Sequence, residues 1–244
     1  MKTGIYEFAG QVVEIDSLFD GIHTLCRDYT AEAEPDFRLA TTRADIEFER
    51  EKSAREDEIE GIPQRHFSDE YLETLSVYRK IAGEMLNRDT LLMHGSTIAV
   101  DGKGYLFTAK SGTGKSTHTR FWRETFGDRA MMVNDDKPLL RITEEGTRVF
   151  GTPWDGKHHL STNTSVPLKA ICILERGEEN EIQQVEPGEV LPLLLQQCHR
   201  PRDPRSLAKV LSLLDRMTKN VKFYRLRCNL DPEAARIAFE GMQE

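Results

Sequence analysis

Residues 109–116, AKSGTGKS, decide the fold class of this 244-residue chain. The stretch fits the phosphate-binding loop pattern G-x-x-x-x-G-K-[ST], with Ala109 in the place of the first glycine. An apolar segment, 105–108, precedes the loop and predicts a strand, and residues 118–126 predict the helix that follows. A strand, a glycine-rich loop and a helix in this order predict an α/β nucleotide-binding core.

The chemistry of phosphate binding explains the spacing within this loop. Gly112 and Gly114 allow backbone conformations that a Cβ atom would hinder, so the loop amides can converge on phosphate oxygens at the positive end of the next helix. Lys115 then reaches the β- and γ-phosphates, and the Ser116 hydroxyl can bind Mg²⁺. The alternative is a structural turn without a ligand. The expected ATP-binding residues are Ser111, Gly112, Thr113, Gly114, Lys115, Ser116 and Thr117.

Residues 131–136, MMVNDD, form a second feature, an apolar strand that ends in paired acids. This pattern is typical of a Walker B segment. One carboxylate can bind Mg²⁺, directly or through water, and the other can act as general base toward an acceptor hydroxyl. Asp135 and Asp136 are therefore candidate catalytic and metal-binding residues, and an ordinary surface turn is the alternative.

Two further candidates lie outside these motifs. His94 stands one strand before the loop, where it is either a structural histidine or part of the site. Lys157 lies in the turn-rich segment 151–159, where it could contact the transferred phosphate or the acceptor, or simply face solvent. Trp122, on the helix after the loop, is expected in the core rather than as a stacking platform for a base.

The overall charge limits the classes of partner. With 33 Lys and Arg against 41 Asp and Glu, the formal net charge is −8, which argues against nonspecific binding to nucleic acid or an anionic membrane. The sequence has no apolar run long enough to span a membrane and no signal-peptide pattern, so a cytoplasmic protein is expected. The cysteines are scattered and predict reduced, buried thiols, with a zinc site as the alternative: Cys26, Cys172, Cys198 and Cys228.

The sequence predicts a small α/β region at 1–88 and a nucleotide-binding domain at 89–244. Residues 43–60 contain eight acidic and four basic residues, which indicates a solvated helix with ion pairs one turn apart; an acidic docking surface is the alternative. Within the first region, strands are predicted at 5–15 and 37–41, and helices at 18–29, 43–60 and from Ser68 onward.

The second region is predicted to hold a mixed sheet with C-terminal helices. Asp101-Gly102 indicates a hairpin turn, so an antiparallel pair leads into the phosphate loop. Asp203-Pro204 and Asp231-Pro232 each indicate the start of a helix. Predicted strands lie at 97–100, 104–109, 130–133, 138–141, 148–150, 168–174 and 221–226, and a further helix at 189–198.

Three motifs together resemble the HPr serine kinase/phosphorylases and the nucleotide-binding half of the phosphoenolpyruvate carboxykinases. They are His94-Gly95-Ser96, Ser111–Ser116 and Asn134-Asp135-Asp136, and the resemblance covers roughly residues 90–230. It implies an HPr-kinase-like P-loop fold with ATP and Mg²⁺ as cofactors. It also implies Lys115 on the phosphates, Ser116 and Asp136 toward Mg²⁺, Asp135 as base, and His94 on the metal or a phosphate. The two families divide the roles of the two acids differently.

The departures from these families bear on the substrate. The chain is about half a carboxykinase in length, and it lacks the Gly-Arg-Asn-type segment of HPr kinases; Arg200 and Arg202 lie in the comparable region as candidates for a phosphate contact. It looks more like the smaller HPr-kinase-related proteins, some of which accompany peptide-modification systems and phosphorylate peptide serines, so HPr itself is not the expected substrate.

The expected function is an ATP- and Mg²⁺-dependent kinase acting on a serine of a peptide or protein. The alternatives are a kinase for a small hydroxyl metabolite such as free serine and a non-catalytic ATP/ADP-binding regulator. Because HPr kinases form oligomers, a homo-oligomer is a further expectation.

Overall fold

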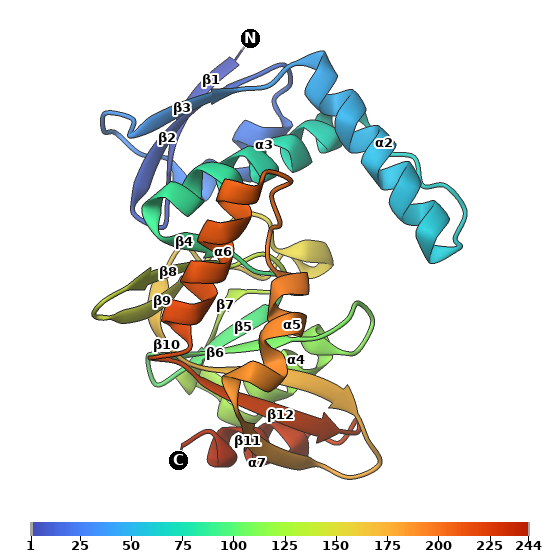
Figure 1. Ribbon diagram of the computed structural model, residues 1–244, viewed down its shortest axis with the longest axis vertical. Coiled ribbons are helices and arrows are strands. Elements are labelled where there is room, and N and C mark those ends of the chain that lie inside the picture. The colour runs from blue at the N-terminus through green and yellow to red at the C-terminus, as the bar shows by residue number, and fades with distance from the viewer. Residues whose placement is uncertain (1, 244) are drawn as a thin grey trace. The chain divides into compact units, whose positions relative to one another are not determined.

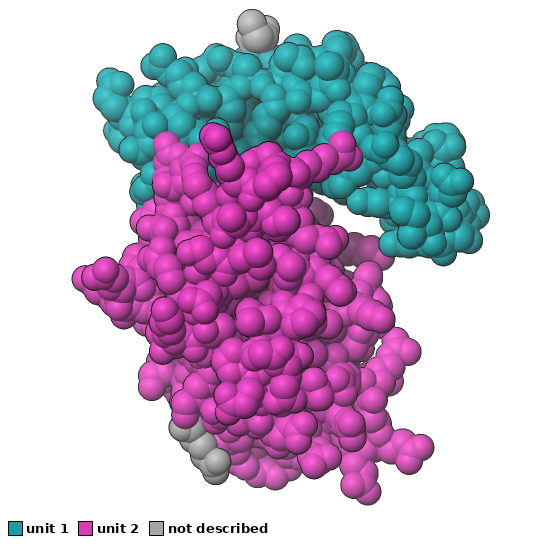
Figure 2. Space-filling view, viewed as in Figure 1, with its two compact units in different colours: residues 1–84 teal, residues 85–244 magenta. Residues whose placement is uncertain are grey.

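The computed structural model describes residues 2–243. The chain divides into two compact units, with the division between Glu84 and Met85 (Figure 2). The sequence predicted a division between residues 88 and 89, and the role of each part stays a prediction. No described helix is long and apolar enough to cross a membrane.

The first unit contains a three-stranded sheet. The predicted strand at 5–15 is in fact a hairpin, because Ala9 and Gly10 both take positive φ, 48° and 68°, and reverse the chain. The predicted helix at 18–29 is shorter and continues as a 3-10 turn at Arg27–Tyr29. The elements are β1 (Lys2–Phe8), β2 (Gln11–Ser17), α1 (Gly21–Leu25) and β3 (Phe37–Ala40), in the sheet order β1-β2-β3.

The acidic segment forms helix α2 (Arg43–Glu60), as predicted. Its first turn is closed by a capping box between Thr42 and Asp45, which satisfies two amides that would otherwise lack partners. The helix is not solvated on every side, however. The carboxylates of Glu49 and Asp57 are buried. Each is compensated by an arginine from outside the helix: Arg79 pairs with Glu49, and Arg65 pairs with Asp57.

Helix α3 (Asp69–Met85) anchors the loops of this unit. The Ser68 hydroxyl accepts a hydrogen bond from the Tyr71 amide at 3.2 Å, as the predicted cap requires. The buried Glu73 carboxylate accepts hydrogen bonds from the backbone amides of Leu18 at 2.7 Å and Phe19 at 3.0 Å, and from the Thr41 hydroxyl. One carboxylate thus holds the ends of β2 and β3.

The second unit is built on a mixed sheet, as predicted (Figure 1). Its order is β4-β8-β9-β10-β6-β5-β7, with β12 beside β10 and β11 beside β12. The short β4 and the edge strand β11 were missed from the sequence, and β10 is longer than predicted. The bounds are β4 (Thr90–Leu92), β5 (Ser96–Val100), β6 (Lys103–Thr108), β7 (Ala130–Asn134), β8 (Leu139–Thr143), β9 (Gly146–Phe150), β10 (Ser165–Arg176), β11 (Glu181–Val185) and β12 (Lys222–Cys228).

Strand β6, which leads into the glycine-rich loop, lies between β10 and β5 in this sheet. It pairs antiparallel with β5 through the predicted turn at Asp101-Gly102, and parallel with β10, which in turn runs parallel to β12. Strand β7 pairs antiparallel with β5 and so has the direction of β6. The carboxyl ends of β6, β7, β10 and β12 therefore meet at one edge, which is where ligands bind in open α/β sheets.

Helices cover both faces of this sheet. One core cluster includes residues of α5 and α6, and another includes residues of α4 and α7. Trp122 is fully buried against Tyr105 and Phe107, so the prediction that it is a core residue is confirmed. All four cysteines are free thiols, as predicted; three of them are buried, whereas Cys228 is only partly buried. The helices are α4 (Lys115–Phe126), α5 (Pro187–Gln197), α6 (Pro204–Met217) and α7 (Glu233–Gly241).

We expect Glu73→Ala to lower the free energy of unfolding by about 2–4 kcal/mol, because two partly buried backbone amides and the buried Thr41 hydroxyl lose their acceptor. Urea unfolding followed by circular dichroism measures the loss. Both tryptophans, Trp122 and Trp154, lie in the second unit, so tryptophan fluorescence reports that unit separately. The exposed Glu51→Ala on α2 is the matched control, and equal midpoints for the two variants would contradict the anchoring role.

Candidate functional site

The glycine-rich loop joins β6 to α4, which begins at Lys115. Gly112 has φ 77° and Gly114 φ 115°, and a Cβ at either position would meet no neighbouring atom within 4 Å. The left-handed backbone, rather than crowding, therefore calls for glycine here. The Arg176 guanidinium, at the end of β10, donates a hydrogen bond to the Gly112 carbonyl at 2.7 Å and holds the loop from the neighbouring strand.

Lys115 is buried at the first position of α4. Its Nζ donates a hydrogen bond to the Ala109 carbonyl at 3.2 Å across the loop. Burial lowers the pKa of this ammonium below its ordinary value, and the nearby charge of Asp136 opposes that shift. An anion placed in the loop would supply the negative partner that this buried cation lacks.

Asp135 follows β7 and is buried. The Ser96 hydroxyl, from the first residue of β5, donates to Asp135 Oδ1 at 2.5 Å and lies 2.9 Å from the Thr119 hydroxyl of α4. These bonds bring together three elements that flank the loop. Ser96 thus orients the carboxylate directly, and Thr119 of α4 acts on it only through Ser96.

Asp136 lies beside two cationic or potentially cationic groups. His94 Nε2 is 3.2 Å and Lys137 Nζ 3.5 Å from Asp136 Oδ1. Burial alone would raise the pKa of Asp136, but the hydrogen bond from His94 and the charge of Lys137 outweigh it and hold that pKa below its ordinary value. The other ring nitrogen of His94 lies 3.0 Å from Gln197 Oε1, at the end of α5.

Asn134 connects the acidic pair to the loop that carries Lys157. Its Oδ1 accepts hydrogen bonds from the amides of Asp136 at 2.8 Å and Lys137 at 2.6 Å. Its Nδ2 donates to the Thr152 carbonyl at 2.9 Å. A buried asparagine thus fixes the turn that presents the acids and the position of the neighbouring loop.

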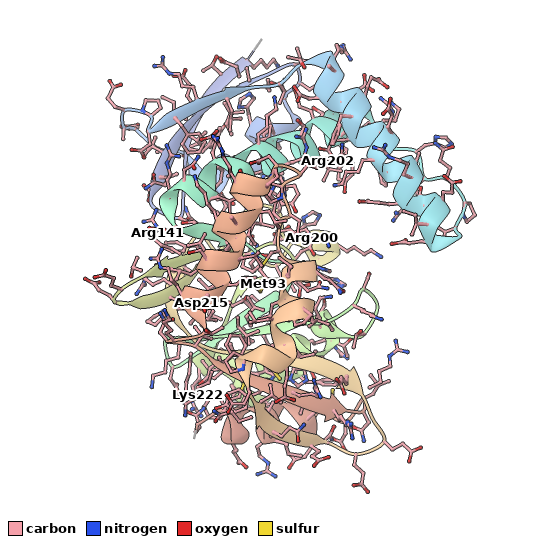
Figure 3. All side chains as sticks on the ribbon, in the orientation of Figure 1. Met93, Arg141, Arg200, Arg202, Asp215 and Lys222 are labelled. Carbon is pink, nitrogen blue, oxygen red and sulfur yellow. The ribbon has the colours of Figure 1, made fainter. Side chains whose placement is uncertain are left out.

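The glycine-rich loop, Lys115, both acids and His94 line one cavity of about 450 Å³. The predicted residue Thr113 lines a second cavity instead, and Arg200 and Arg202 line neither; Figure 3 shows both arginines on the connection between α5 and α6. The catalytic roles of the predicted residues stay predictions. The lining residues are His94, Ser111, Gly112, Gly114, Lys115, Ser116, Thr117, Asp135, Asp136, Gly156, Lys157 and His158.

No role was predicted for the residues that position this site. Ser96 and Asn134 belong to the motifs His94-Gly95-Ser96 and Asn134-Asp135-Asp136, so a polar residue within a motif was the available signal. Gln197 and Arg176 had no local signal, because each contacts a residue far away in the sequence, His94 and Gly112 respectively.

The oxygen atoms in the first cavity fit Mg²⁺. Among the described residues, no group of three or more His, Cys, Asp or Glu side chains forms a candidate metal cage. Mg²⁺ does not need one, because it usually binds one or two carboxylates together with substrate phosphates and water. The Ser116 hydroxyl and the carboxylates of Asp135 and Asp136, which line the same cavity, meet that requirement.

His118 lies one turn into α4 and is buried. The indole N–H of Trp122 donates a hydrogen bond to its Nε2 at 3.0 Å. Burial lowers the pKa of His118 to about 3, so the imidazole is neutral at physiological pH. Since an indole nitrogen only donates, Nε2 must be the acceptor and the ring proton sits on Nδ1.

Residues 65–233 match the family model described as SynChlorMet cassette protein ScmC. Among solved structures, the HPr(Ser) kinase/phosphatase from Coxiella burnetii aligns with a TM-score of 0.34 and 12% sequence identity, over 63% of this chain and 99% of that one. A TM-score this low does not establish a common fold. No curated protein sequence matches the chain.

We expect the neutral His118 to make stability pH-dependent. Unfolded histidine binds a proton below about pH 6.5, whereas the folded residue does so only near pH 3. Stability from this group is therefore complete above pH 6.5 and falls as the pH drops, by about 1.4 kcal/mol per pH unit.

Chemical denaturation of wild type and His118→Gln between pH 4.5 and 7.5 measures this difference. The glutamine variant, which cannot titrate, should lose less stability on acidification. His158→Gln, at an exposed position, is the control for removal of an imidazole. Parallel pH profiles for wild type and His118→Gln would contradict the buried, neutral state.

Proposed function

The chain belongs to the family of the SynChlorMet cassette protein ScmC, and we propose that it is an ATP- and Mg²⁺-dependent kinase that transfers the γ-phosphoryl group to a serine hydroxyl of a peptide or protein. One observation carries the proposal. The glycine-rich loop, the buried Lys115 and the acids Asp135 and Asp136 line a single cavity. Phosphoryl transfer needs little more from a protein than such positioned charges.

The loop amides and Lys115 would bind the phosphates. The amino end of α4 adds positive potential at the same point, and the buried ammonium has no carboxylate within ion-pair distance among the described residues. When bound at Ser116 and Asp136, Mg²⁺ would neutralise charge on the phosphate oxygens. His94 and Lys137 would keep Asp136 ionised, and so able to serve as a ligand.

Asp135 is the proposed general base. Its Oδ1 is engaged by Ser96, which leaves Oδ2 for the acceptor. The acceptor oxygen would attack the γ-phosphorus, its proton would pass to Asp135, and the bond to the β-phosphate oxygen would break with ADP as leaving group. Lys157 and His158 are exposed at the rim of the cavity, where their side chains can meet the acceptor or the transferred phosphoryl group.

Incubation with γ-labelled ATP, Mg²⁺ and a panel of serine peptides, proteins and small alcohols tests the function directly. Label on a peptide or protein supports the proposal. Label on a small alcohol instead would indicate a metabolite kinase. Tight nucleotide binding without transfer to any member of the panel would indicate a regulator and contradict the kinase assignment.

We expect Lys115→Ala to weaken ATP binding by about 10- to 100-fold, because a charge-assisted hydrogen bond to phosphate is lost. Isothermal titration calorimetry in the presence of Mg²⁺ measures the affinity. Lys110→Ala is the matched control, since Lys110 lies on the same loop but is exposed and lines neither cavity. Unchanged affinity in Lys115→Ala would argue against phosphate binding by this loop.

We expect Asp135→Asn to reduce turnover by about 10²–10⁴-fold, the usual contribution of a general base, while ATP still binds. Turnover is measured on the acceptor identified with labelled ATP, and ATP affinity in parallel. Asp128→Asn, at an exposed position after α4, is the control and should have wild-type turnover. Full turnover in Asp135→Asn would remove this residue from the base role.

A further inference from the structure

A second cavity, of about 650 Å³, shares the phosphate loop with the first. Gly112, Gly114 and Thr117 line both cavities and so mark the border between them. The second cavity opens at the carboxyl ends of β10 and β12. Its remaining lining residues are Thr113, His118, Phe121, Leu174, Arg176, Gly177, Cys228, Asn229 and Leu230.

The lining of this cavity is largely apolar, and the one cationic side chain among its described residues, Arg176, already donates to the Gly112 carbonyl. Phe121 and Leu174 are buried in its wall, whereas Leu230 is 79% exposed although it is a large apolar side chain. No carboxylate of the described residues 2–243 lines it. The segment with Leu230 is held in place, because the Asn229 side chain donates to the Glu178 carbonyl at 2.7 Å and accepts from the Asp231 amide at 2.9 Å.

Among the described residues on this wall, His118 is the polar one that is almost fully buried and lacks a partner on one side of its ring. It is 3% exposed, and Trp122 occupies its Nε2. Its Nδ1 carries the proton, and no described residue accepts a hydrogen bond from it. Because His118 lines the cavity, this N–H group is available to a ligand that offers an acceptor.

We propose that the second cavity binds the nucleoside of ATP, and that the Nδ1–H group of His118 donates a hydrogen bond to an acceptor atom of the base or ribose. This inference rests on the proposed kinase function. The triphosphate on the loop reaches the first cavity with its terminal phosphates, and the nucleoside extends past Thr117 into the second. The base lies against Phe121, Leu174 and Leu230, and Trp122 positions His118 by fixing which nitrogen carries the proton.

Comparison of MgATP with Mg-tripolyphosphate tests this inference, because tripolyphosphate has the phosphates without the nucleoside. Calorimetric titration should give wild type an affinity for ATP at least about 10-fold higher than for tripolyphosphate. In His118→Leu the affinity for ATP should fall about 10-fold, while that for tripolyphosphate should not change. His118→Gln should bind ATP nearly as wild type does, because its oxygen can accept from Trp122 while its amide group donates to the ligand.

A variant at the rim keeps the test independent of folding in the core. Leu230→Ser should weaken binding of ATP by about 3- to 10-fold through lost apolar contact, again without effect on tripolyphosphate. Leu211→Ser is the matched control, since Leu211 is an exposed leucine of α6 that lines neither cavity.

The outcomes separate the inference from the function on which it rests. Equal affinities of wild type for ATP and tripolyphosphate would overturn the nucleoside cavity and leave phosphate binding intact. Unchanged ATP affinity in His118→Leu would overturn the role of His118. Failure of wild type to bind either ligand would overturn the proposed function, and the nucleoside cavity with it.

Discussion

The pairing of β6 on both of its sides is the constraint on which the candidate site depends. An antiparallel partner, β5, and a parallel partner, β10, fix the strand from both edges. The loop that leaves β6 therefore starts from a rigid position, and α4 begins directly after it. Because β7 and β12 have the same direction as β6, their ends also point to this edge. The antiparallel β5 contributes its beginning, with Ser96, to the same edge.

A network of hydrogen bonds between buried polar groups fixes the positions of the charged side chains at this edge. Ser96 and Asn134 each join two or more segments, and each bond matters because an unpaired polar group in the interior is costly. Lys115, Lys137 and His94 therefore lie around the carboxylates of Asp135 and Asp136. The net charge of −8 hides this local balance. Part of the acidic excess belongs to α2 in the first unit, where buried ion pairs with Arg65 and Arg79 hold two of its carboxylates.

Much of the second unit was predictable, because its signals are local. The hairpin at Asp101-Gly102, the helix that starts at Asp203-Pro204 and the mixed character of the sheet follow from short patterns. The first hairpin was missed because its turn, Ala9-Gly10, lacks the usual Asn-Gly or Asp-Gly signature. The short β4 and the edge strand β11 were missed because a few residues with little alternation carry too weak a pattern.

The sequence by itself determined the chemistry available at the site: a loop with glycines at the left-handed positions, one lysine in register, and an acid pair after an apolar strand. These features depend on residues close together in the chain, so spacing reveals them. Only the tertiary structure decided what surrounds them. Gln197 meets His94 across 103 positions and Arg176 meets Gly112 across 64, and Thr113 and His118 line a separate cavity. Such contacts depend on which strands become neighbours in the sheet, and pairing between distant strands leaves no periodic trace in the sequence.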